Sequence, residues 1–327
     1  MINAPFEINE HTLFVSASVG ISIFPEDGED NFVLLKNADT AMYRAKELGR
    51  NQYQYFTQQM KEDAVTKMDI EKGLRTALNE NHFEIEFQPQ IETVTGTIIG
   101  AEALLRCNQK GLKDIPAGTF IDIAEKGRLI GEVGLHAMEL VFKYLREWLD
   151  KGLALPTISI NVSTKQLRNK KFVTEVKDLL SQYRITPSQI KFEITESALM
   201  ERIDKIAVLL DEFVELGIGL SVDDFGVGQS SLSYLRKLPI QEIKIDRSFI
   251  DGVVDEPDDR AIARTIIKMG QALGLRVVAE GIETEEQFNV LKEEECEIVQ
   301  GFYFHKPLHQ EAFYTLIKES NSKSNRS

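Results

Sequence analysis

Eight short apolar segments that alternate with helical patterns limit the fold of this chain more than any other feature. The strand candidates are residues 83–91, 97–106, 157–162, 190–195, 219–223, 242–246, 276–280 and 297–301. Helical patterns separate most of them, at 131–151, 168–183, 199–215, 257–273 and 284–294. Strands that alternate with helices predict a parallel sheet. Eight of them over roughly 240 residues fit one α/β, TIM-like (β/α)8 barrel, whose usual size is about 250 residues.

The connection between the first two strand candidates breaks this alternation. Only Glu92-Thr-Val-Thr-Gly96 lies between them, which is too short for a crossover helix and predicts a hairpin. We therefore expect an antiparallel first strand in a barrel whose other strands are parallel. The carboxyl ends of those parallel strands would form the functional face.

The segment before the barrel has the pattern of an incomplete domain. Residues 1–57 contain one strand candidate, Leu13–Phe24, a turn at Pro25–Gly28 and an amphipathic helix from Phe32 to Leu48. One strand and one helix form a poor core, so we expect the C-terminal fragment of an α+β domain. The rest divides into a connecting helix, the barrel and a flexible tail, at residues 58–82, 83–318 and 319–327.

Composition and charge exclude several classes of partner. The 327 residues carry a formal net charge of −14, so the chain lacks the basic surface that captures nucleic-acid polymers or acidic membranes. A phosphate substrate is still compatible, because bound cations reverse the local sign. Cys107 and Cys296 are far apart and the histidines are scattered, which excludes a disulfide framework and zinc-type spacing.

No apolar run is long enough to span a membrane, and the amino terminus lacks the pattern of a signal peptide. We therefore expect a cytoplasmic fragment without membrane contact, while a longer parent protein could be anchored upstream.

Polar side chains end or interrupt seven of the strand-like segments. A single acid at a strand end is more often a cap or a turn residue. Six oxygen-bearing residues and a lysine at successive strand ends are hard to explain in that way: Glu102, Asn161, Glu193, Asp223, Asp224, Glu280 and Lys244. The adjacent aspartates stand out, because neighbouring side chains on a strand point to opposite faces and cannot both enter a core.

We expect these groups to gather at one rim of the barrel. Crowded carboxylates repel one another, so they either take up protons or bind cations. Oxygen ligands without His or Cys favour Mg²⁺ or Mn²⁺ over zinc. Adjacent aspartates suit two ions with one carboxylate shared between them, an arrangement that can clamp a phosphate and activate a water for in-line attack.

The chain resembles the EAL domain family, bacterial phosphodiesterases that act on cyclic di-GMP. Glu102-Ala-Leu104-Leu-Arg106 matches the signature of that family, and about residues 74 to 318 follow it in order and spacing. The further matching motifs are Phe87-Gln88-Pro89, Asn161-Val-Ser163, Glu193-Ile-Thr-Glu196, Asp223-Asp224-Phe-Gly226, Lys244-Ile-Asp246, Ala279-Glu280-Gly-Ile-Glu283 and Gln300-Gly301-Phe302.

This resemblance implies a role for each matching residue. One metal ion would take Glu102, Asn161, Glu193 and Asp223, and the second would take Asp223, Asp224 and Glu280. Lys244 would hold the attacking water, and Glu280 also matches a proposed general base. The implied substrate contacts are Gln88, Glu102, Leu104, Arg106, Asp246 and Gln300. Glu196 would anchor the loop after the fifth strand, and Glu283 would lie near the metals.

The loop from Phe225 to Tyr234 departs from the family. Val227 stands where threonine or alanine is usual, and Gln229 where tyrosine is common. Cys107 and Asn108 also differ from the usual residues after the signature arginine. Because none of these changes removes an expected metal ligand, they bear on affinity and loop regulation rather than on the chemistry.

The amino-terminal piece resembles the end of a GGDEF domain, the diguanylate cyclase fold. The resemblance lies in Val15–Ile21, Ala38–Lys46 and Gly49–Asn51, and the signature Gly-Gly-Asp-Glu-Phe is absent from this sequence. We therefore expect no cyclase activity, and we expect Lys46 and Arg50, which match triphosphate contacts in that family, to be solvated.

The resemblance implies hydrolysis of cyclic di-GMP to linear pGpG with two Mg²⁺ or Mn²⁺ ions, and it makes a homodimer through the barrel plausible. Two alternatives belong to other classes. A catalytically silent receptor would bind cyclic di-GMP without cleaving it, and an interaction scaffold would not bind the dinucleotide at all.

Overall fold

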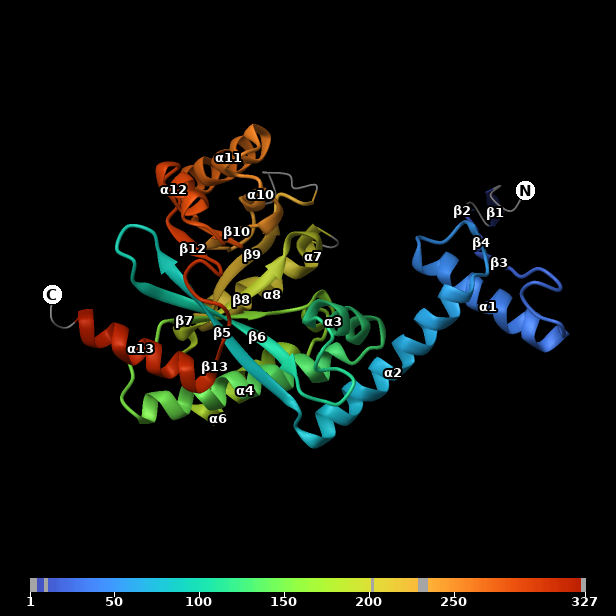
Figure 1. Ribbon diagram of the computed structural model, residues 1–327, viewed down its shortest axis with the longest axis horizontal. Coiled ribbons are helices and arrows are strands. Elements are labelled where there is room, and N and C mark those ends of the chain that lie inside the picture. Colours follow the sequence, from blue (N-terminus) through green and yellow to red (C-terminus); the bar gives the residue numbers. More distant parts are fainter. Residues whose placement is uncertain (1–4, 9–10, 201–202, 229–234, 325–327) are drawn as a thin grey trace. The chain divides into compact units, whose positions relative to one another are not determined.

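Eight strands close into a barrel in the larger of two units of the chain, Leu74–Ser327 (Figure 1). The computed structural model describes residues 5–8, 11–200, 203–228 and 235–324. The barrel strands are β5 (Phe83–Glu92), β6 (Ile98–Cys107), β7 (Thr157–Asn161), β8 (Ile190–Thr195), β9 (Gly219–Phe225), β10 (Glu242–Ile245), β11 (Arg276–Glu280) and β12 (Ile298–Gln300). The expected TIM-like barrel is confirmed.

The first barrel strand runs against both of its neighbours. β5 pairs antiparallel with β6 and, where the barrel closes, with β12, while β6 to β12 pair in parallel. This confirms the antiparallel first strand that the short connection predicts. A two-residue strand, β13 (Leu308–His309), pairs with β5 outside the barrel.

The expected helices all form, with ends shifted by a few residues. They are α4 (Ile130–Asp150), α6 (Phe172–Tyr183), α8 (Ile203–Leu216), α11 (Pro257–Leu273) and α12 (Glu285–Glu293). Local signals set some ends: Pro257 occupies the first turn of α11, Gly274 closes it at φ +71°, and Thr284 forms a capping box with Gln287 at the start of α12.

Several helices, most of them short, have no counterpart among the expected elements. They are α3 (Ala117–Lys126), α5 (Thr164–Leu167), α7 (Glu196–Met200), α10 (Arg247–Asp251) and α13 (Gln310–Ser324). Most span few turns, so a 3.6-residue pattern has little length in which to appear.

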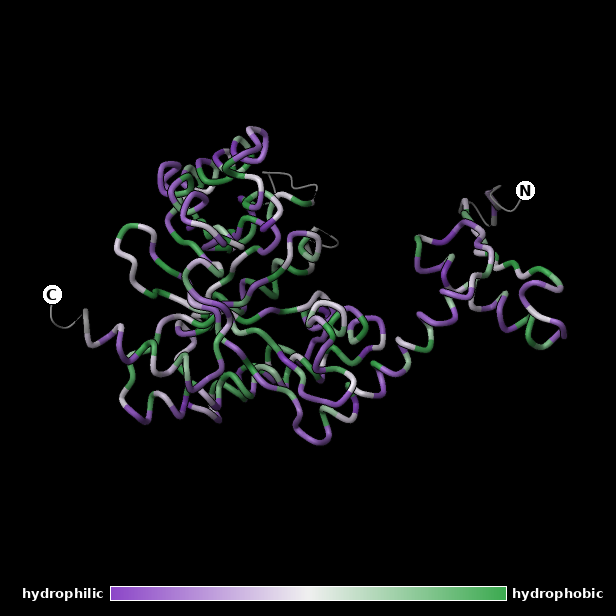
Figure 2. Tube along the Cα trace, viewed as in Figure 1, coloured by the Kyte–Doolittle hydropathy of each residue, from purple (hydrophilic) through white to green (hydrophobic). Residues whose placement is uncertain are grey.

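The hydrophobic core lies between the strands and the surrounding helices. Phe192 of β8 packs edge-on against Phe213 of α8, with ring centroids 5.0 Å apart, and Phe172 of α6 joins them. On the opposite wall Phe87 of β5 stacks on Phe313 of α13, also at 5.0 Å. Figure 2 shows hydrophilic and hydrophobic residues alternating along the outer helices, as expected when one helix face packs on a barrel.

The inside of the barrel is polar and holds two ion pairs between β8 and β10. Lys191 Nζ lies 2.7 Å from both carboxylate oxygens of Glu242, and Lys244 Nζ lies 2.6 Å from Glu193 Oε2. All four side chains are buried. Because residues two apart on a strand share a face, the two pairs form consecutive rungs, with lysine and glutamate exchanged between the strands. Arg276 Nη2 also approaches Glu242, at 3.4 Å.

The smaller unit, Met1–Gly73, pairs short strands beside a helix. Its elements are β1 (Phe6–Ile8), β2 (His11–Leu13), β3 (Val19–Ile21), α1 (Asn31–Glu47), β4 (Tyr53–Tyr55) and the first part of α2 (Gln58–Glu80). The expectation of one strand over Leu13–Phe24 is wrong, because β2 ends at Leu13 and β3 spans only three residues. β3 pairs in parallel with β4, a strand too short and polar to show in the sequence.

Gly20 lets β3 lie close to α1, since a Cβ there would fall 1.8 Å from the carbonyl oxygen of Ala38. Large hydrophobic side chains such as Phe14 and Phe32 remain exposed in this unit. Lys46 and Arg50 are exposed as well. No helix in the described ranges is long and apolar enough to cross a membrane.

The ion pair between Lys191 and Glu242 gives a prediction about stability. Lys191→Met leaves the Glu242 carboxylate buried, with Arg276 as its remaining cationic neighbour in the described part of the chain, and such a change costs about 3–5 kcal/mol in unfolding free energy. Lys191→Met combined with Glu242→Leu removes both charges and should recover most of that loss. Urea unfolding of the two single variants and the double variant measures the coupling. Strictly additive losses would contradict the prediction.

Candidate functional site

A bulge in β9 brings two adjacent aspartates to one cavity. Val222 pairs with Ile243 and Phe225 with Ile245, so three steps along β9 face two along β10. One extra residue on a strand breaks the alternation of side chains. Asp224 takes a left-handed backbone conformation, φ +54°, which aspartate tolerates better than most residues. Asp223 and Asp224 therefore line the same cavity, although they are neighbours on a strand.

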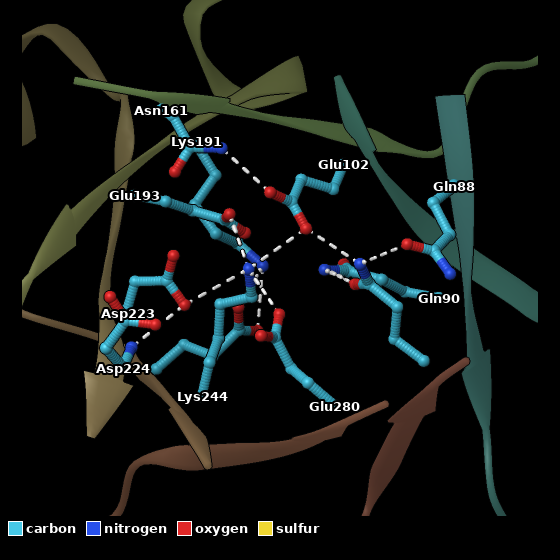
Figure 3. Close-up of polar contacts among 12 residues, drawn as sticks. Gln88, Gln90, Glu102, Asn161, Lys191, Glu193, Asp223, Asp224, Lys244 and Glu280 are labelled. Carbon is cyan, nitrogen blue, oxygen red and sulfur yellow. Dashed lines mark hydrogen bonds and ion pairs between the residues drawn. The ribbon is translucent and has the colours of Figure 1, made fainter. Parts of the chain in front are cut away.

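Lys244 is the centre of the site. Its Nζ atom lies 2.5 Å from Glu280 Oε1, 2.6 Å from Glu193 Oε2, 3.1 Å from Glu102 Oε2 and 3.4 Å from Asp223 Oδ1 (Figure 3). The lysine is fully buried. Four strands thus aim a carboxylate at one ammonium group on a fifth, β10, which brings the expected strand-end residues together.

A chain of amides fixes the position of Glu102. Asn161 Nδ2 donates to Glu102 Oε1 and Gln300 Nε2 to Glu102 Oε2, both at 2.7 Å. Gln300 is held in turn by Gln88, whose Oε1 it meets at 3.2 Å, and by Gln90, whose Nε2 donates to it at 3.0 Å. Gln90 was not expected in the site. Its signal is its place two residues after Gln88, on the same face of β5.

Burial and crowding change the protonation of these acids. Burial raises the pKa of Glu193 to about 8, against the opposing effect of Lys244, and raises the pKa of Glu280 well above its usual range. Partial burial and the neighbouring Asp223 raise the pKa of Asp224 to about 6. Burial also acts to raise the pKa of Glu102, but Lys244 and the amide donors outweigh it and leave that pKa lowered.

The donor chemistry fits hard divalent cations. Four carboxylates surround a single ammonium group, with Asp224 and Asn161 beside them, so the cluster has more negative charge than Lys244 balances. Glu193 Oε1 is buried without a hydrogen-bond partner in the described part of the chain. A buried oxygen of this kind can act as a ligand to a cation. No group of three or more such side chains among the described residues is already arranged as a metal site, because the carboxylates turn toward Lys244 instead.

Two cavities flank the carboxylates. One, of about 710 Å³, is lined on its polar side by Asn161, Glu193 and the aspartates, and on its apolar side by residues of α3 and α4. Leu104 and Arg106 also line it. The other, of about 220 Å³, is lined by Gln88, Glu102, Glu280, Glu283, Gln300 and Phe302, among others. An extended ligand could therefore lie across the carboxylates with one part in each cavity.

Glu196 holds the start of the loop after β9. Its buried Oε2 accepts hydrogen bonds from the backbone N–H of Gly226 at 2.9 Å and of Gly228 at 3.2 Å. A Cβ at Gly228 would lie 2.6 Å from Glu196 Oε1, so the contact requires glycine there. Val227 is exposed. Gln229 and the rest of the loop to Tyr234 lie outside the described residues.

Three expected site residues make contacts away from Lys244. Asp246 caps α10 by accepting from the Ser248 N–H at 3.0 Å. Glu283 Oε1 pairs with Arg247 at 2.9 Å. Arg106 pairs with Glu86, a residue that the sequence did not single out. Cys107 and Cys296 are buried free thiols.

Comparisons with known proteins point to one family. Residues 71–307 match the EAL domain, and residues 1–52 match the diguanylate cyclase GGDEF domain. Signaling protein YkoW of Bacillus subtilis is 40% identical over 97% of this chain and 40% of its own length. MucR of Pseudomonas aeruginosa, a bifunctional diguanylate cyclase/cyclic di-GMP phosphodiesterase, is 39% identical over 94% of this chain and 45% of its own length.

Solved structures agree with these sequence matches. The PaMucR phosphodiesterase in complex with c-di-GMP has a TM-score of 0.72 at 37% identity, covering 75% of this chain and 99% of that one. The EAL enzyme Bd1971, bound to cAMP and cyclic di-GMP, has a TM-score of 0.74 at 30% identity, covering 89% of this chain and 76% of that one. The chain spans less than half the length of YkoW and MucR.

The raised pKa of Glu193 predicts how stability depends on pH. The folded pKa of about 8 exceeds the unfolded value of about 4.3, so the folded state binds more protons between these values and loses stability as pH rises. Without divalent cations, the melting temperature should therefore fall from about pH 5 to about pH 8. Glu193→Gln should flatten this fall, and Mg²⁺ should stabilise the unaltered protein more at the higher pH. An unchanged slope in Glu193→Gln would contradict the prediction.

The Glu196 contact predicts a local effect on the loop. Glu196→Ala removes the acceptor of two backbone N–H groups, whereas Glu196→Gln keeps one oxygen in place. Hydrogen exchange of Gly226 and Gly228 should accelerate by about tenfold or more in Glu196→Ala and much less in Glu196→Gln. Equal exchange rates in both variants would show that the carboxylate does not hold this segment.

Proposed function

Since the chain belongs to the EAL domain family, we propose that it is a metal-dependent phosphodiesterase that opens cyclic di-GMP to linear pGpG. The observation that carries this proposal is the concentration of four carboxylates around Lys244, with Asp224 on the same cavity, at the carboxyl ends of the parallel strands. Relatives named as cyclic di-GMP phosphodiesterases support the substrate: MucR and NbdA of Pseudomonas aeruginosa and PdeR of Escherichia coli.

Two divalent cations, Mg²⁺ or Mn²⁺, would be held by residues already at the rim. Glu102, Asn161, Glu193 and Asp223 would hold the first ion, and Asp223, Asp224 and Glu280 the second. When bound, the ions supply charge neutralisation at the phosphate and lower the pKa of a coordinated water. Asp223 would be shared between the two ions, and the bulge that turns Asp224 toward the same cavity would make the second position possible.

Lys244 and Glu280 orient the attacking water. Their side chains lie 2.5 Å apart, so a water beside both can donate to the carboxylate and accept from the ammonium group. Attack of this water on phosphorus expels the ribose 3′ oxygen. Gln88, Leu104, Arg106, Asp246 and Gln300 would contact the dinucleotide, with Arg106 placed to donate to a phosphate.

We also propose a domain division into residues 1–57, 58–82, 83–318 and 319–327, with no cyclase activity from the first part. The GGDEF match ends at residue 52 and the EAL match begins at residue 71, which supports a boundary between them. A homodimer through the barrel and a cytoplasmic location complete the proposal. The concentration dependence of activity, measured with light scattering, tests the dimer.

Hydrolysis of cyclic di-GMP tests the activity directly. Purified protein should form pGpG, detected by liquid chromatography, with Mg²⁺ or Mn²⁺ and not in EDTA. Binding without cleavage at saturating metal would favour the receptor alternative, and no calorimetric signal would favour the scaffold.

Single substitutions test the site. Glu102→Ala should abolish turnover, because it removes a carboxylate that meets Lys244, Asn161 and Gln300. Glu297→Gln, an exposed glutamate before β12, should leave turnover unchanged and serves as the matched control. Retained activity in folded Glu102→Ala protein would disprove the assignment of this residue.

A further inference from the structure

Arg106 stands between two cavities on the β5–β6 hairpin. It lines the cavity of about 710 Å³ that is also lined by Glu193, Asp223 and Asp224, the acidic cluster of this cavity. It also lines a separate cavity of about 540 Å³, whose other polar residues include Glu84, Glu86 and His309. The acidic cluster does not line this second cavity. Arg106 therefore borders the acidic cavity on one side and the cavity with Glu84, Glu86 and His309 on the other.

The guanidinium group is bound on the side away from the acidic cluster. Its Nε atom donates to Glu86 Oε2 at 2.7 Å, and Nη1 donates to the carbonyl oxygen of Leu105 at 3.1 Å. In the strand register Arg106 lies opposite Glu84, whereas Glu86 lies opposite Leu104. Arg106 therefore reaches diagonally along the hairpin to Glu86 rather than straight across to Glu84.

Glu86 is itself held in place from its other side. On β13, His309 lies in register with Glu86, and its Nε2 atom is 3.5 Å from Glu86 Oε1. The Glu86 side chain is only 19% exposed, compared with 41% for Glu84. Partial burial and a neighbour on each side leave Glu86 fewer alternative positions, so its contact with Arg106 is firmer than that of a freely solvated pair.

The contact between Arg106 and Glu86 competes with a bidentate hydrogen bond from Arg106 to phosphate. An arginine holds phosphate best through two parallel N–H···O bonds from adjacent nitrogens. Two of the three guanidinium nitrogens are already engaged, and the Nε edge faces a carboxylate that also repels a phosphate. A phosphate on the substrate side can therefore bind to the Nε/Nη2 edge, one of the two edges that give a paired contact, only if the bond to Glu86 is given up.

We propose that Glu86 restrains Arg106 and competes with the phosphate of the substrate for it, so that Glu86 lowers the affinity of the site for the dinucleotide. The proposal rests on the proposed function, from which it takes the contact between Arg106 and phosphate. Glu86 acts here as a positioning residue, since it works through Arg106 and not on the reacting atoms.

Glu86→Gln tests this, with Glu84→Gln as the matched control. Both changes remove one negative charge from the same face of β5, but only Glu86 bonds to Arg106. Glu86→Gln should lower KM for cyclic di-GMP about fivefold with kcat unchanged, a size typical of a partly exposed ion pair. Glu84→Gln should change KM less than about twofold. In an Arg106→Met background, Glu86→Gln should change KM no more than Glu84→Gln does.

Calorimetric titration with cyclic di-GMP in EDTA gives a second readout that needs no turnover, and Kd should fall as KM does. An equal KM and Kd in the two glutamine variants, or a higher KM in Glu86→Gln, would overturn the proposal. If the unaltered protein binds the dinucleotide but does not cleave it, the proposed function fails while the Kd comparison still decides the role of Glu86. If neither protein binds the dinucleotide, with or without divalent cations, both fail.

Discussion

A single buried ammonium group determines how the site is arranged. Lys244 lies among Glu102, Glu193, Asp223 and Glu280, and none of these charges could stay inside the barrel alone, because an unpaired buried charge is costly. The lysine balances part of the negative charge, and burial keeps the pKa values of Glu193 and Glu280 raised. The site thus holds more carboxylates than Lys244 can neutralise, and the protonation of some of them lets the barrel keep them buried. Carboxylates crowded in this way take up protons when divalent cations are absent and bind cations when these are present.

The second ion pair shows that the polar interior extends below the reacting groups. Lys191 and Glu242 repeat the pairing of Glu193 and Lys244 one rung lower, with the charges exchanged between β8 and β10. Both pairs reach across β9, which lies between β8 and β10, and a shift of either strand would leave buried charges without partners. The positions of Lys244 and Glu193 therefore depend on the barrel below them as well as on their own contact.

Much of the fold was predictable from the sequence, because the strands are short apolar runs and the longer helices carry a clear period. The acidic residues at strand ends could be found by the same reasoning, since parallel strands finish at one rim. The bulge at Asp224 could not, because a left-handed residue and a register shift arise from pairing with β10. The diagonal contact between Arg106 and Glu86 depends on hairpin register, and the role of Gln90 depends on closure of the barrel.

The reversed direction of β5 decides where the chain enters the barrel. In a barrel of parallel strands the first strand starts at the face opposite the reactive rim. Here Phe83 pairs with Cys107, so β5 starts at the rim itself, directly after α2 ends at Glu80. Glu84, Glu86 and Gln88 follow within a few residues. The first side chains of the barrel after α2 are therefore those at the rim, and the opposite face of the barrel comes later in the chain.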